Sequence, residues 1–416
     1  MQLTKFLNTN FLLFLILLLS LFLRINRVID IPPSLNWDEV SIGYNAYSIL
    51  KTGRDEWNQI LPLHFKAYGE YKLPAQVYFS IPGIAIFGLN EFGVRVTPVI
   101  YGTLTVLFLF FLAKELSGNK WIGLISAFLL AISPWHIQLT RASFESSFSV
   151  MWVVLGIWFM VKGLKDKKWW VFSTLPLALA IYTYNAARVF TPLFLITTFF
   201  IYRKEVLKDL KLFTVSCLLL VVLMIPLAAF FLSGEATARL SLVSITDDPG
   251  FVLRINEARG NLNLPEPIPI LVHNKVTHFA YVFTKNYLSH FTPSYLFVSG
   301  AGHKQHHVQN IGQLYLFQAP FVLIGLIYLF SKRNKFRWLI VSWILLSFIP
   351  VSITIDSIPH ALRTLIAAPA YQIVTAFGLY ATFKYLKKKE EVWLFVGGGV
   401  VALNCRFNIY GYINNY

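Results

Sequence analysis

The sequence predicts an all-α protein that crosses a membrane about eleven times. Of its 416 residues, 56% are hydrophobic and only 13% are charged, and the mean hydropathy is +0.59. A chain of this composition is too apolar for a soluble domain. Several apolar runs also reach the length that an α-helix needs to cross a hydrocarbon layer of about 30 Å. We therefore expect a single multi-span membrane domain over residues 1–416, with no separate soluble C-terminal domain.

The apolar runs are separated by polar or charged connections. A further run, Leu73–Gly88, is short and contains Pro82, so we interpret it as an interfacial or re-entrant segment. Cys217 and Cys405 both lie in apolar runs, which predicts neither a disulfide framework nor a metal site. The spans are expected near residues 8–24, 92–113, 120–134, 144–161, 169–184, 189–202, 212–232, 312–331, 337–353, 364–383 and 391–405.

The basic residues alternate along the chain in a pattern that predicts its orientation. More than half of the 36 Lys and Arg residues lie at Lys5 and in five alternate connections, whereas the short connections between these carry one arginine each. By the positive-inside rule the N-terminus and the basic connections face the cytoplasm. The net charge of +16 is then a signal of topology, and nucleic-acid binding is not expected. The basic connections hold Lys114/Lys120, Lys162/Lys165/Lys167/Lys168, Arg203/Lys204/Lys208/Lys211, Lys332/Arg333/Lys335/Arg337 and Lys384/Lys387/Lys388/Lys389.

Two long segments, about residues 24–91 and 233–311, are then expected on the outer side of the membrane. Both contain apolar positions at helical spacing in stretches too short to span, such as Val276, Phe279 and Phe283. Such stretches tend to lie on the membrane surface. We therefore expect two outer loops that carry juxtamembrane helices.

Ionisable residues of the outer side gather close to the membrane, where charged groups are rare and often functional. Carboxylates in such a set suit proton abstraction from a hydroxyl or an amine, and arginines with a lysine suit a phosphate. Two other interpretations stay open: Asp38 is the N-cap of a helix, and single arginines are membrane anchors. The residues are Asp38, Glu39, Glu70, Lys72, Arg141, Glu145, Arg188, His360 and Arg363.

Several motifs resemble those of a known superfamily. W-D-E-V-S-I-G-Y-N-A-Y-S-I-L-K-T-G (residues 37–53) is similar to the acidic motif after the first span of GT-C glycosyltransferases, above all the branch of protein O-mannosyltransferases and the lipid A aminoarabinose transferase. Glu70-Tyr-Lys-Leu-Pro74 resembles a later motif of that loop, with Leu73 where the family often has proline. Further similar stretches are Phe87–Pro98, Ser133–Glu145 and Pro359–Ala370. The resemblance extends over residues 8–385 and is strongest over 36–160.

The resemblance implies a membrane glycosyltransferase that moves a sugar from a polyprenyl-phosphate donor to a protein, lipid or envelope glycan on the outer face of the plasma membrane. It implies that Asp38 is the base and that Lys72, Arg363 and His360 hold the phosphate. Glu145, where the family usually has Asp, either positions the acceptor or shares the base role. The other outer residues of the set are expected to contact substrate.

The resemblance implies no cofactor, because this branch generally works without a catalytic metal. A divalent cation is left open at His303, His306 and His307, for which a solvated loop is the alternative. Two other functions are considered: a lipid-carrier flippase, and a polyprenyl-linked glycan ligase or polymerase centred on residues 233–311. The sequence specifies neither the sugar nor the acceptor nor the length of the lipid.

Overall fold

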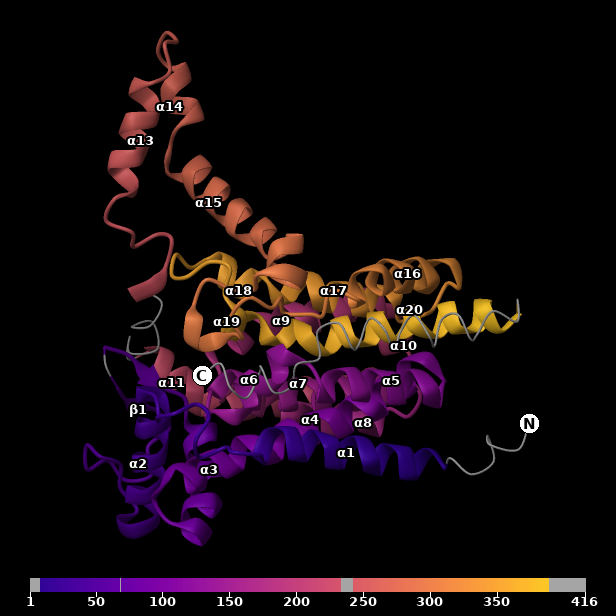
Figure 1. Ribbon diagram of the computed structural model, residues 1–416. Coiled ribbons are helices and arrows are strands. Elements are labelled where there is room, and N and C mark those ends of the chain that lie inside the picture. The colour runs from indigo at the N-terminus through magenta and orange to yellow at the C-terminus, as the bar shows by residue number, and fades with distance from the viewer. Residues whose placement is uncertain (1–7, 68, 233–241, 389–416) are drawn as a thin grey trace.

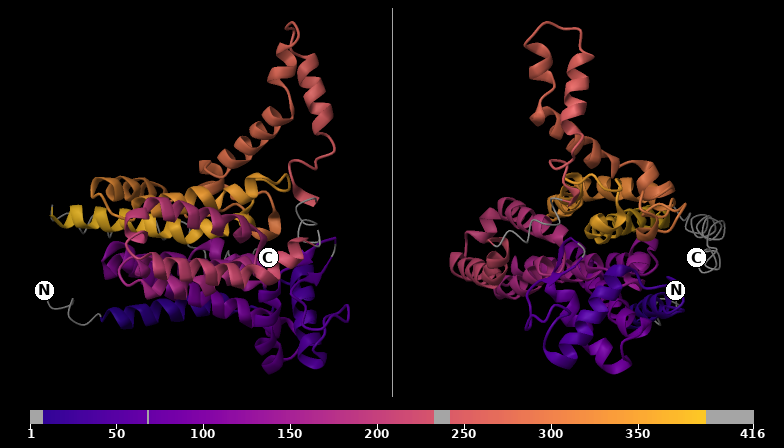
Figure 2. Two further views of the ribbon diagram at one scale, coloured as in Figure 1. Left: turned by 180° about the vertical axis from the view of Figure 1, so that it is seen from behind. Right: turned by 90° about the vertical axis from the view of Figure 1, so that its left-hand side faces the viewer.

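A computed structural model describes residues 8–67, 69–232 and 242–388, and within these ranges the chain is mostly helical (Figure 1). Most helices lie side by side with roughly parallel axes, and two further views show the same bundle (Figure 2). Three helices of the second long loop project away from it. The predicted all-α class is therefore confirmed.

The bundle is formed by apolar helices that follow the predicted runs. Each of the first ten expected spans falls on one helix or on consecutive helices, whereas the eleventh, 391–405, lies outside the described residues. The helices are α1 (Thr9–Ile25), α4 (Glu91–Ser117), α5 (Lys120–Ala131), α6 (Pro134–Arg141), α7 (Glu145–Gly163), α8 (Lys168–Ile181), α9 (Asn185–Ile201), α10 (Arg203–Val206), α11 (Leu210–Leu232), α16 (Gln318–Ser331), α17 (Arg337–Ser347), α18 (Ile349–Ser352), α19 (Ala361–Thr364) and α20 (Ala368–Lys388).

Only some of these helices have the length and composition of a complete span. Among the described residues four helical stretches qualify: α4, α7, Leu210–Ala228 in α11, and Ala361–Lys387 across α19 and α20. The pair α5 and α6, bent by 55°, would make a fifth span. The other bundle helices are apolar but shorter. A multi-pass membrane protein is supported, and the number of eleven spans stays a prediction.

The first long loop folds into a compact unit at one end of the bundle (Figure 1). It consists of α2 (Trp37–Thr52), a hairpin of β1 (Phe65–Lys66) and β2 (Tyr71–Lys72), and α3 (Pro74–Phe87). The side chain of Asn36 caps α2 by accepting a hydrogen bond from the Glu39 amide at 3.0 Å. The interpretation of Asp38 as the N-cap is therefore wrong, because Asp38 lies inside the first turn of the helix.

The second long loop forms an arm of three helices, α13 (Phe251–Gly260), α14 (Ile268–Val272) and α15 (Lys275–Ser289). The expected apolar helix through Val276 and Phe283 is thus present as α15. The base of the arm pairs with the chain after α18, where Asn286 Nδ2 donates to the Thr354 carbonyl at 2.8 Å. A π-helical turn (Ser294–Val298) and a 3-10 turn (Lys304–His306) lead back toward the bundle.

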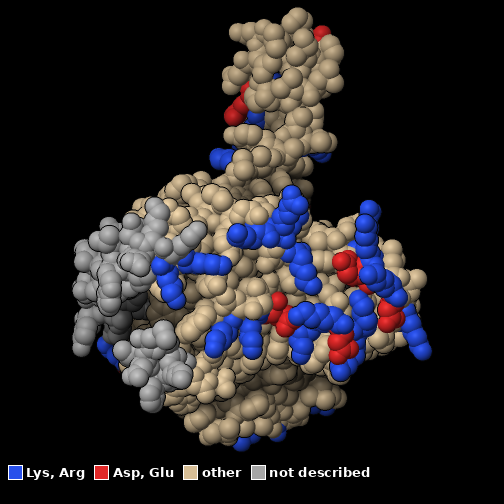
Figure 3. Space-filling view, turned by 90° about the vertical axis from the view of Figure 1, so that its right-hand side faces the viewer, with Lys and Arg blue, Asp and Glu red and all other residues tan. Residues whose placement is uncertain are grey.

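Lysines and arginines gather at the end of the bundle opposite to α2 and the hairpin (Figure 3). This end holds the α5 and α10 termini and the start of α1 (Figure 1). Its basic residues include Lys162, Lys165 and Lys204. The structure therefore brings the alternate basic connections to one face, as the positive-inside rule requires of a single side of the membrane.

A fully buried arginine ties α1 to the helices behind it. Arg24 Nε donates to Thr140 Oγ1 at 2.9 Å, and one terminal nitrogen lies 2.7 Å from His136 Nδ1. Gly102 on α4 permits this approach, because a Cβ there would lie 2.9 Å from Arg24 Nε. A buried charge is tolerated only when its hydrogen bonds are satisfied, so this contact fixes where α1 ends and the first long loop begins.

Candidate active site

The centre of the candidate site is an ion pair between Asp38 and Lys72. Lys72 Nζ donates a hydrogen bond to Asp38 Oδ1, and the carboxylate of Glu70 lies 3.7 Å from the same nitrogen. The Lys72 side chain is only 5% exposed, whereas that of Asp38 is 26% exposed. Lys72 is therefore buried next to Glu70. The Asp38 carboxylate is the more exposed member of the pair and the one that a substrate can reach.

Local packing of the hairpin places Lys72 opposite Asp38. Phe65 pairs with Lys72 across the hairpin and is buried against Ile42 and Val77 of the flanking helices. Gly43 lets α2 approach α4 closely, since a Cβ there would lie 2.6 Å from a methyl group of Val94. Both partners of the ion pair are thus mounted on elements that share one small apolar core.

The carboxylates around Lys72 keep it charged. Burial alone would lower its pKa, but Glu145, Asp38 and Glu70 together raise the pKa of Lys72 above its ordinary value of 10.5. Desolvation disfavours the charged amine, and nearby negative charges favour it. Lys72 is therefore a permanent cation at neutral pH, and it holds three acids around itself.

Glu145 joins this group from the start of α7. Its carboxylate acts electrostatically on Lys72 and on Arg188, which lies in the first turn of α9. The neighbouring Ala75 amide at the start of α3 donates to the Tyr182 carbonyl at 3.2 Å and so links the hairpin to the end of α8. Asp38, Glu70, Lys72, Glu145 and Arg188 thus form one cluster, which we call the acidic group.

Glu39 lies beside Asp38 in sequence but has a different set of contacts. It is fully buried and forms a two-point salt bridge with Arg95 of α4, with N–O distances of 2.9 and 3.1 Å. It also accepts a hydrogen bond from the Ser143 amide at 3.1 Å. Its predicted contact with substrate is not supported by this geometry, which favours a structural role.

Arg141 is also an anchor in this structure. Its guanidinium donates to the carbonyls of Leu23, Arg27 and Ile31 at 2.9, 3.2 and 3.1 Å, at the end of α1 and in the turns that follow. A helix end leaves carbonyl groups without partners inside the helix, and Arg141 satisfies one of them. These three contacts place Arg141 as an anchor for the end of α1 and the turns after it.

A second cluster forms between α18 and α19. One Arg363 nitrogen donates to Asp356 Oδ2 at 2.9 Å and another to Thr354 Oγ1 at 2.8 Å. Burial alone would raise the pKa of Asp356, but the Ser357 hydroxyl and the Arg363 guanidinium hold it below the ordinary value. Arg363 is thus oriented by a carboxylate that itself faces solvent, because the Asp356 side chain is 49% exposed.

Three histidines stack next to Arg363. The ring centroids of His303 and His306 are 4.0 Å apart, and that of His306 is 5.0 Å from His360. Burial first, and the charge of Arg363 second, hold the pKa of His360 well below 6.5. Burial and the neighbouring His303 lower the pKa of His306 to about 3. The His306 and His360 rings are therefore neutral at pH 7 and can donate or accept hydrogen bonds without adding charge.

The two clusters face each other through His306. Both the Asp38 carboxylate and the Arg363 guanidinium act electrostatically on His306. The His306 ring also meets Phe144, the residue before Glu145, with 5.2 Å between ring centroids. Trp135 of α6 holds the second cluster in place through a hydrogen bond of 2.9 Å to the Ala361 carbonyl. We call Arg363, Asp356 and the three histidines the cationic group.

Among the described residues, no cluster of three or more His, Cys, Asp and Glu side chains is arranged to hold a metal ion. In the loop considered above for a divalent cation, the rings of His303 and His306 stack on each other. His307, the third histidine of that loop, turns back, and its Nδ1 donates to the His303 carbonyl at 2.9 Å.

The structure unites most of the predicted site residues but assigns some of them differently. Asp38, Glu70, Lys72, Glu145 and Arg188 meet in the acidic group, and His360 and Arg363 in the cationic group. Sequence reasoning missed Arg95, Asp356 and the role of His306. Arg95 lies within the motif Phe87–Pro98, so an arginine inside an apolar span was the available signal.

Comparisons with known proteins show which family and which fold this chain resembles. Residues 74–230 match the family model described as dolichyl-phosphate-mannose-protein mannosyltransferase. The apo oligosaccharyltransferase of Archaeoglobus fulgidus superposes with a TM-score of 0.57 at 16% identity, over 93% of this chain and 52% of that one. The apo form of ArnT from Cupriavidus metallidurans gives 0.55 at 15% identity, over 89% and 59%. This is the fold of the GT-C glycosyltransferases.

Curated relatives align over shorter stretches. The dolichyl-phosphooligosaccharide-protein glycotransferase 2 of Pyrococcus furiosus is 30% identical over 107 residues, 25% of this chain and 14% of that protein. An uncharacterized protein of Aquifex aeolicus is 29% identical over 148 residues, 34% of this chain and 30% of that protein. The chain therefore spans a minor part of these relatives and about half of the two GT-C structures. The resemblance drawn from the motifs is confirmed.

The buried Glu39–Arg95 pair leads to a prediction about stability. Glu39→Ala leaves the Arg95 guanidinium buried without its carboxylate, and breaking such a pair costs about 3–5 kcal/mol. We expect a clearly lower unfolding temperature for the purified protein in detergent. Glu91→Ala, at the exposed start of α4, is the control and should unfold like the wild type. Equal unfolding temperatures for both variants would show that the pair is dispensable.

The lowered pKa of His306 predicts a loss of stability in acid. The folded-state pKa of His306 is about 3, below the ordinary 6.5, so its contribution is complete above pH 6.5 and is lost as the pH falls toward 3. We expect His306→Asn to reduce the drop in unfolding temperature between pH 7 and pH 4.5. His278→Asn, on the arm, is the matched control. The same acid sensitivity in wild type and His306→Asn would contradict this assignment.

Proposed function

We propose that the chain is a membrane glycosyltransferase that transfers a sugar from a polyprenyl-phosphate donor to a nucleophilic acceptor, with Asp38 as the base. The observation that carries the proposal is the Asp38–Lys72 pair, in which an accessible carboxylate is held by a buried lysine at the end of the bundle. The match to the mannosyltransferase family and the GT-C fold supports this type of reaction.

In the proposed step the acceptor oxygen or nitrogen bonds to the anomeric carbon of the sugar. The bond between that carbon and the phosphate oxygen breaks, and the polyprenyl phosphate leaves with the bonding electrons. The acceptor proton passes to Asp38, which is within reach of substrate because its side chain is partly exposed. Proton removal by a positioned carboxylate and charge stabilisation on the leaving group are the two contributions that the protein supplies.

The phosphate is assigned to the cationic group. Lys72 already faces three carboxylates, whereas the carboxylate that Arg363 contacts, Asp356, is half exposed. A guanidinium can bind a phosphate at two points. A phosphate can therefore bind the Arg363 guanidinium while Asp356 stays in contact with it. His306 and His360, neutral beside it, supply hydrogen bonds. In this assignment Lys72 positions Asp38, and Arg188 positions Glu145 near the acceptor.

Two structures of similar proteins support a polyprenyl-phosphate donor. The oligosaccharyltransferase of A. fulgidus has been solved with an inhibitory peptide and a dolichol-phosphate, and ArnT of C. metallidurans with undecaprenyl phosphate. The first of these also makes a peptide one candidate class of acceptor. The alternatives, a flippase and a glycan ligase, are less favoured, because the acidic group lies at the end of the bundle and is built on the first long loop.

We also propose that this end faces the outside of the plasma membrane and that the N-terminus is cytoplasmic. The gathering of basic residues at the opposite end supports this orientation (Figure 3). Cysteines introduced at exposed Gln59 and Lys204, in a background lacking Cys217 and Cys405, should be labelled from opposite sides by a membrane-impermeant maleimide. Labelling of both from one side would refute the orientation.

If Asp38 is the base, the Asp38→Asn variant should lose sugar transfer but keep donor binding. The amide keeps the size of the side chain but does not accept the acceptor proton at neutral pH, so we expect transfer to fall by at least 100-fold, within the usual range for a lost acid–base group. Donor binding should remain, and Arg363→Gln should instead weaken donor binding. Both are measured with a reconstituted polyprenyl-phosphate sugar and cell-envelope acceptors.

Glu56→Gln is the control for this experiment, because Glu56 lies in the same loop and contacts Asn45 rather than Lys72. It should retain activity. Substantial transfer by Asp38→Asn would place the base elsewhere, with Glu145 as the next residue to replace. Unchanged donor binding in Arg363→Gln would remove the phosphate from the cationic group.

A further inference from the structure

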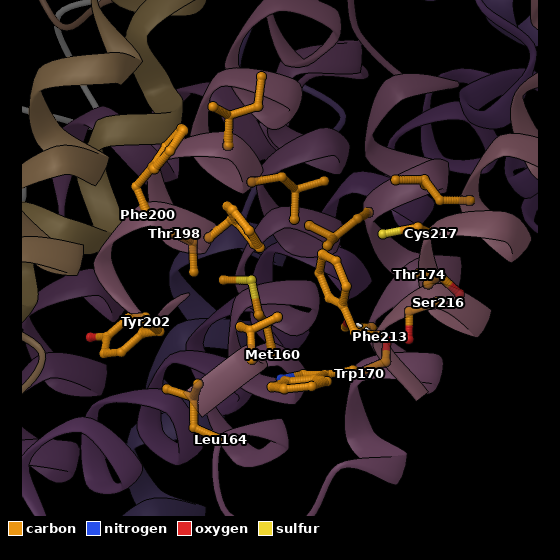
Figure 4. Close-up of a pocket in the computed structure, with 17 residues that line it drawn as sticks. Met160, Leu164, Trp170, Thr174, Thr198, Phe200, Tyr202, Phe213, Ser216 and Cys217 are labelled. Atoms are coloured by element: carbon orange, nitrogen blue, oxygen red, sulfur yellow. Dashed lines mark hydrogen bonds between the residues drawn. The ribbon is translucent and has the colours of Figure 1, made fainter. Parts of the chain in front are cut away.

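An apolar groove lies between α7, α8, α9 and α11, away from the candidate active site (Figure 4). Its volume is about 480 Å³, within the range of about 300–1,000 Å³ that is typical of ligand pockets. The walls are almost wholly apolar and include Met160, Leu177, Phe199, Phe213 and Leu220. These helices lie in the membrane-embedded bundle, so the natural occupant of the groove is a hydrocarbon chain.

The groove lies far from the candidate active site along the same helices. Glu145 begins α7, whereas Met160 lies in the last turn of that helix, roughly 22 Å farther along at 1.5 Å per residue. Arg188 lies in the first turn of α9, and Phe199 lines the groove near its other end. The groove therefore lies at the basic end of the bundle, in the opposite leaflet to Asp38 and Arg363.

The rim of the groove carries positive charge. Trp170 and Tyr202 line it, and Lys167 Nζ lies 4.1 Å from the centre of the Trp170 ring. The two connections beside these aromatic residues, 165–168 and 203–211, hold seven basic and three acidic residues, a net charge of +4. Aromatic residues next to lysines at the end of an apolar groove match the boundary between acyl chains and headgroups.

One polar atom inside the groove has no partner among the described residues. Thr198 Oγ1 is buried and makes no hydrogen bond there, and the side chain lines the groove. Such a hydroxyl is costly to bury unless another group bonds to it. An ester oxygen of a lipid, near the point where its chain enters the groove, would satisfy Thr198.

We infer that this groove is a binding site for an anionic glycerophospholipid of the leaflet at the basic end. One acyl chain lies between α8, α9 and α11, and the phosphate headgroup contacts Lys167, Lys208 and Lys211. The site is independent of the glycosyl-transfer reaction and needs no polyprenyl donor. Bound lipid fills the space between four helices and so stabilises the bundle, because a ligand that binds only the folded state shifts the folding equilibrium toward it.

The test uses the full chain in nanodiscs with equal amounts of phosphatidylglycerol and phosphatidylcholine of identical acyl chains. The lipid that stays bound after transfer to detergent is identified by native mass spectrometry. We expect at least a fivefold preference for phosphatidylglycerol. Lys208→Gln with Lys211→Gln should reduce the preference below twofold. Lys332→Gln with Arg333→Gln, which removes the same charge from another basic connection, should not.

A second pair of variants tests the groove itself. Ser216→Trp fills it, since Ser216 lines the wall, whereas Leu218→Trp places the same side chain at a position on α11 that is 60% exposed. We expect retained phosphatidylglycerol to fall by at least fivefold in the first variant only. No lipid preference, equal effects of the paired variants, or displacement of the lipid by polyprenyl phosphate would each overturn the proposal.

The labelling rate of the native Cys217 tests the site without a substitution in the groove. It lines the groove and is exposed within it. In a Cys405→Ser protein, an apolar maleimide should label Cys217 at least threefold more slowly when phosphatidylglycerol replaces phosphatidylcholine. Equal labelling rates in the two lipids would contradict the proposed site even if Ser216→Trp failed to fold.

Discussion

The candidate site depends on one buried interaction, the salt bridge between Glu39 and Arg95. Glu39 fixes the first turn of α2, where it also accepts from the Asn36 amide at 3.1 Å, and it reaches the Ser143 amide just before α7. Arg95 in turn donates to backbone carbonyls of the segment after α1, among them Pro32 and Ser34, both at 2.7 Å. Three parts of the chain are therefore held by two residues, and two of these parts, the starts of α2 and α7, carry Asp38 and Glu145.

This arrangement explains why two adjacent acids have different roles. Side chains of successive helical residues point about 100° apart, so when Glu39 is turned inward to Arg95, Asp38 is turned toward the hairpin and Lys72. A buried ion pair is weak evidence for added stability, because desolvation offsets its attraction. Here the pair sets the orientation of α2. Because Glu39 is bound to Arg95, the Asp38 side chain points toward Lys72.

The sequence predicted the helical class, the two folded loops and the meeting of Asp38 with Lys72, because these depend on local periodicity and on motifs that occur in a fixed order. It did not predict the partners of buried arginines. From the charge pattern Arg141 is one cation on the outer side. In the structure its guanidinium donates to a carbonyl at the end of α1. Arg95 was not recognised as a site residue, because its partner lies 56 positions away and no periodicity links them. Side-chain pairing at such separations is decided by packing, which a single sequence does not display.

The two clusters of the site differ in charge balance, and this difference assigns their roles. In the acidic group Asp38, Glu70 and Glu145 surround Lys72, so its positive charge is already compensated and an approaching phosphate would meet carboxylates. In the cationic group Arg363 contacts the half-exposed carboxylate of Asp356, and burial together with the charge of Arg363 keeps His306 and His360 neutral. In the proposed reaction a phosphate would therefore be stabilised on the side of Arg363, and a group that loses a proton on the side of Asp38. The charges of both clusters act on His306.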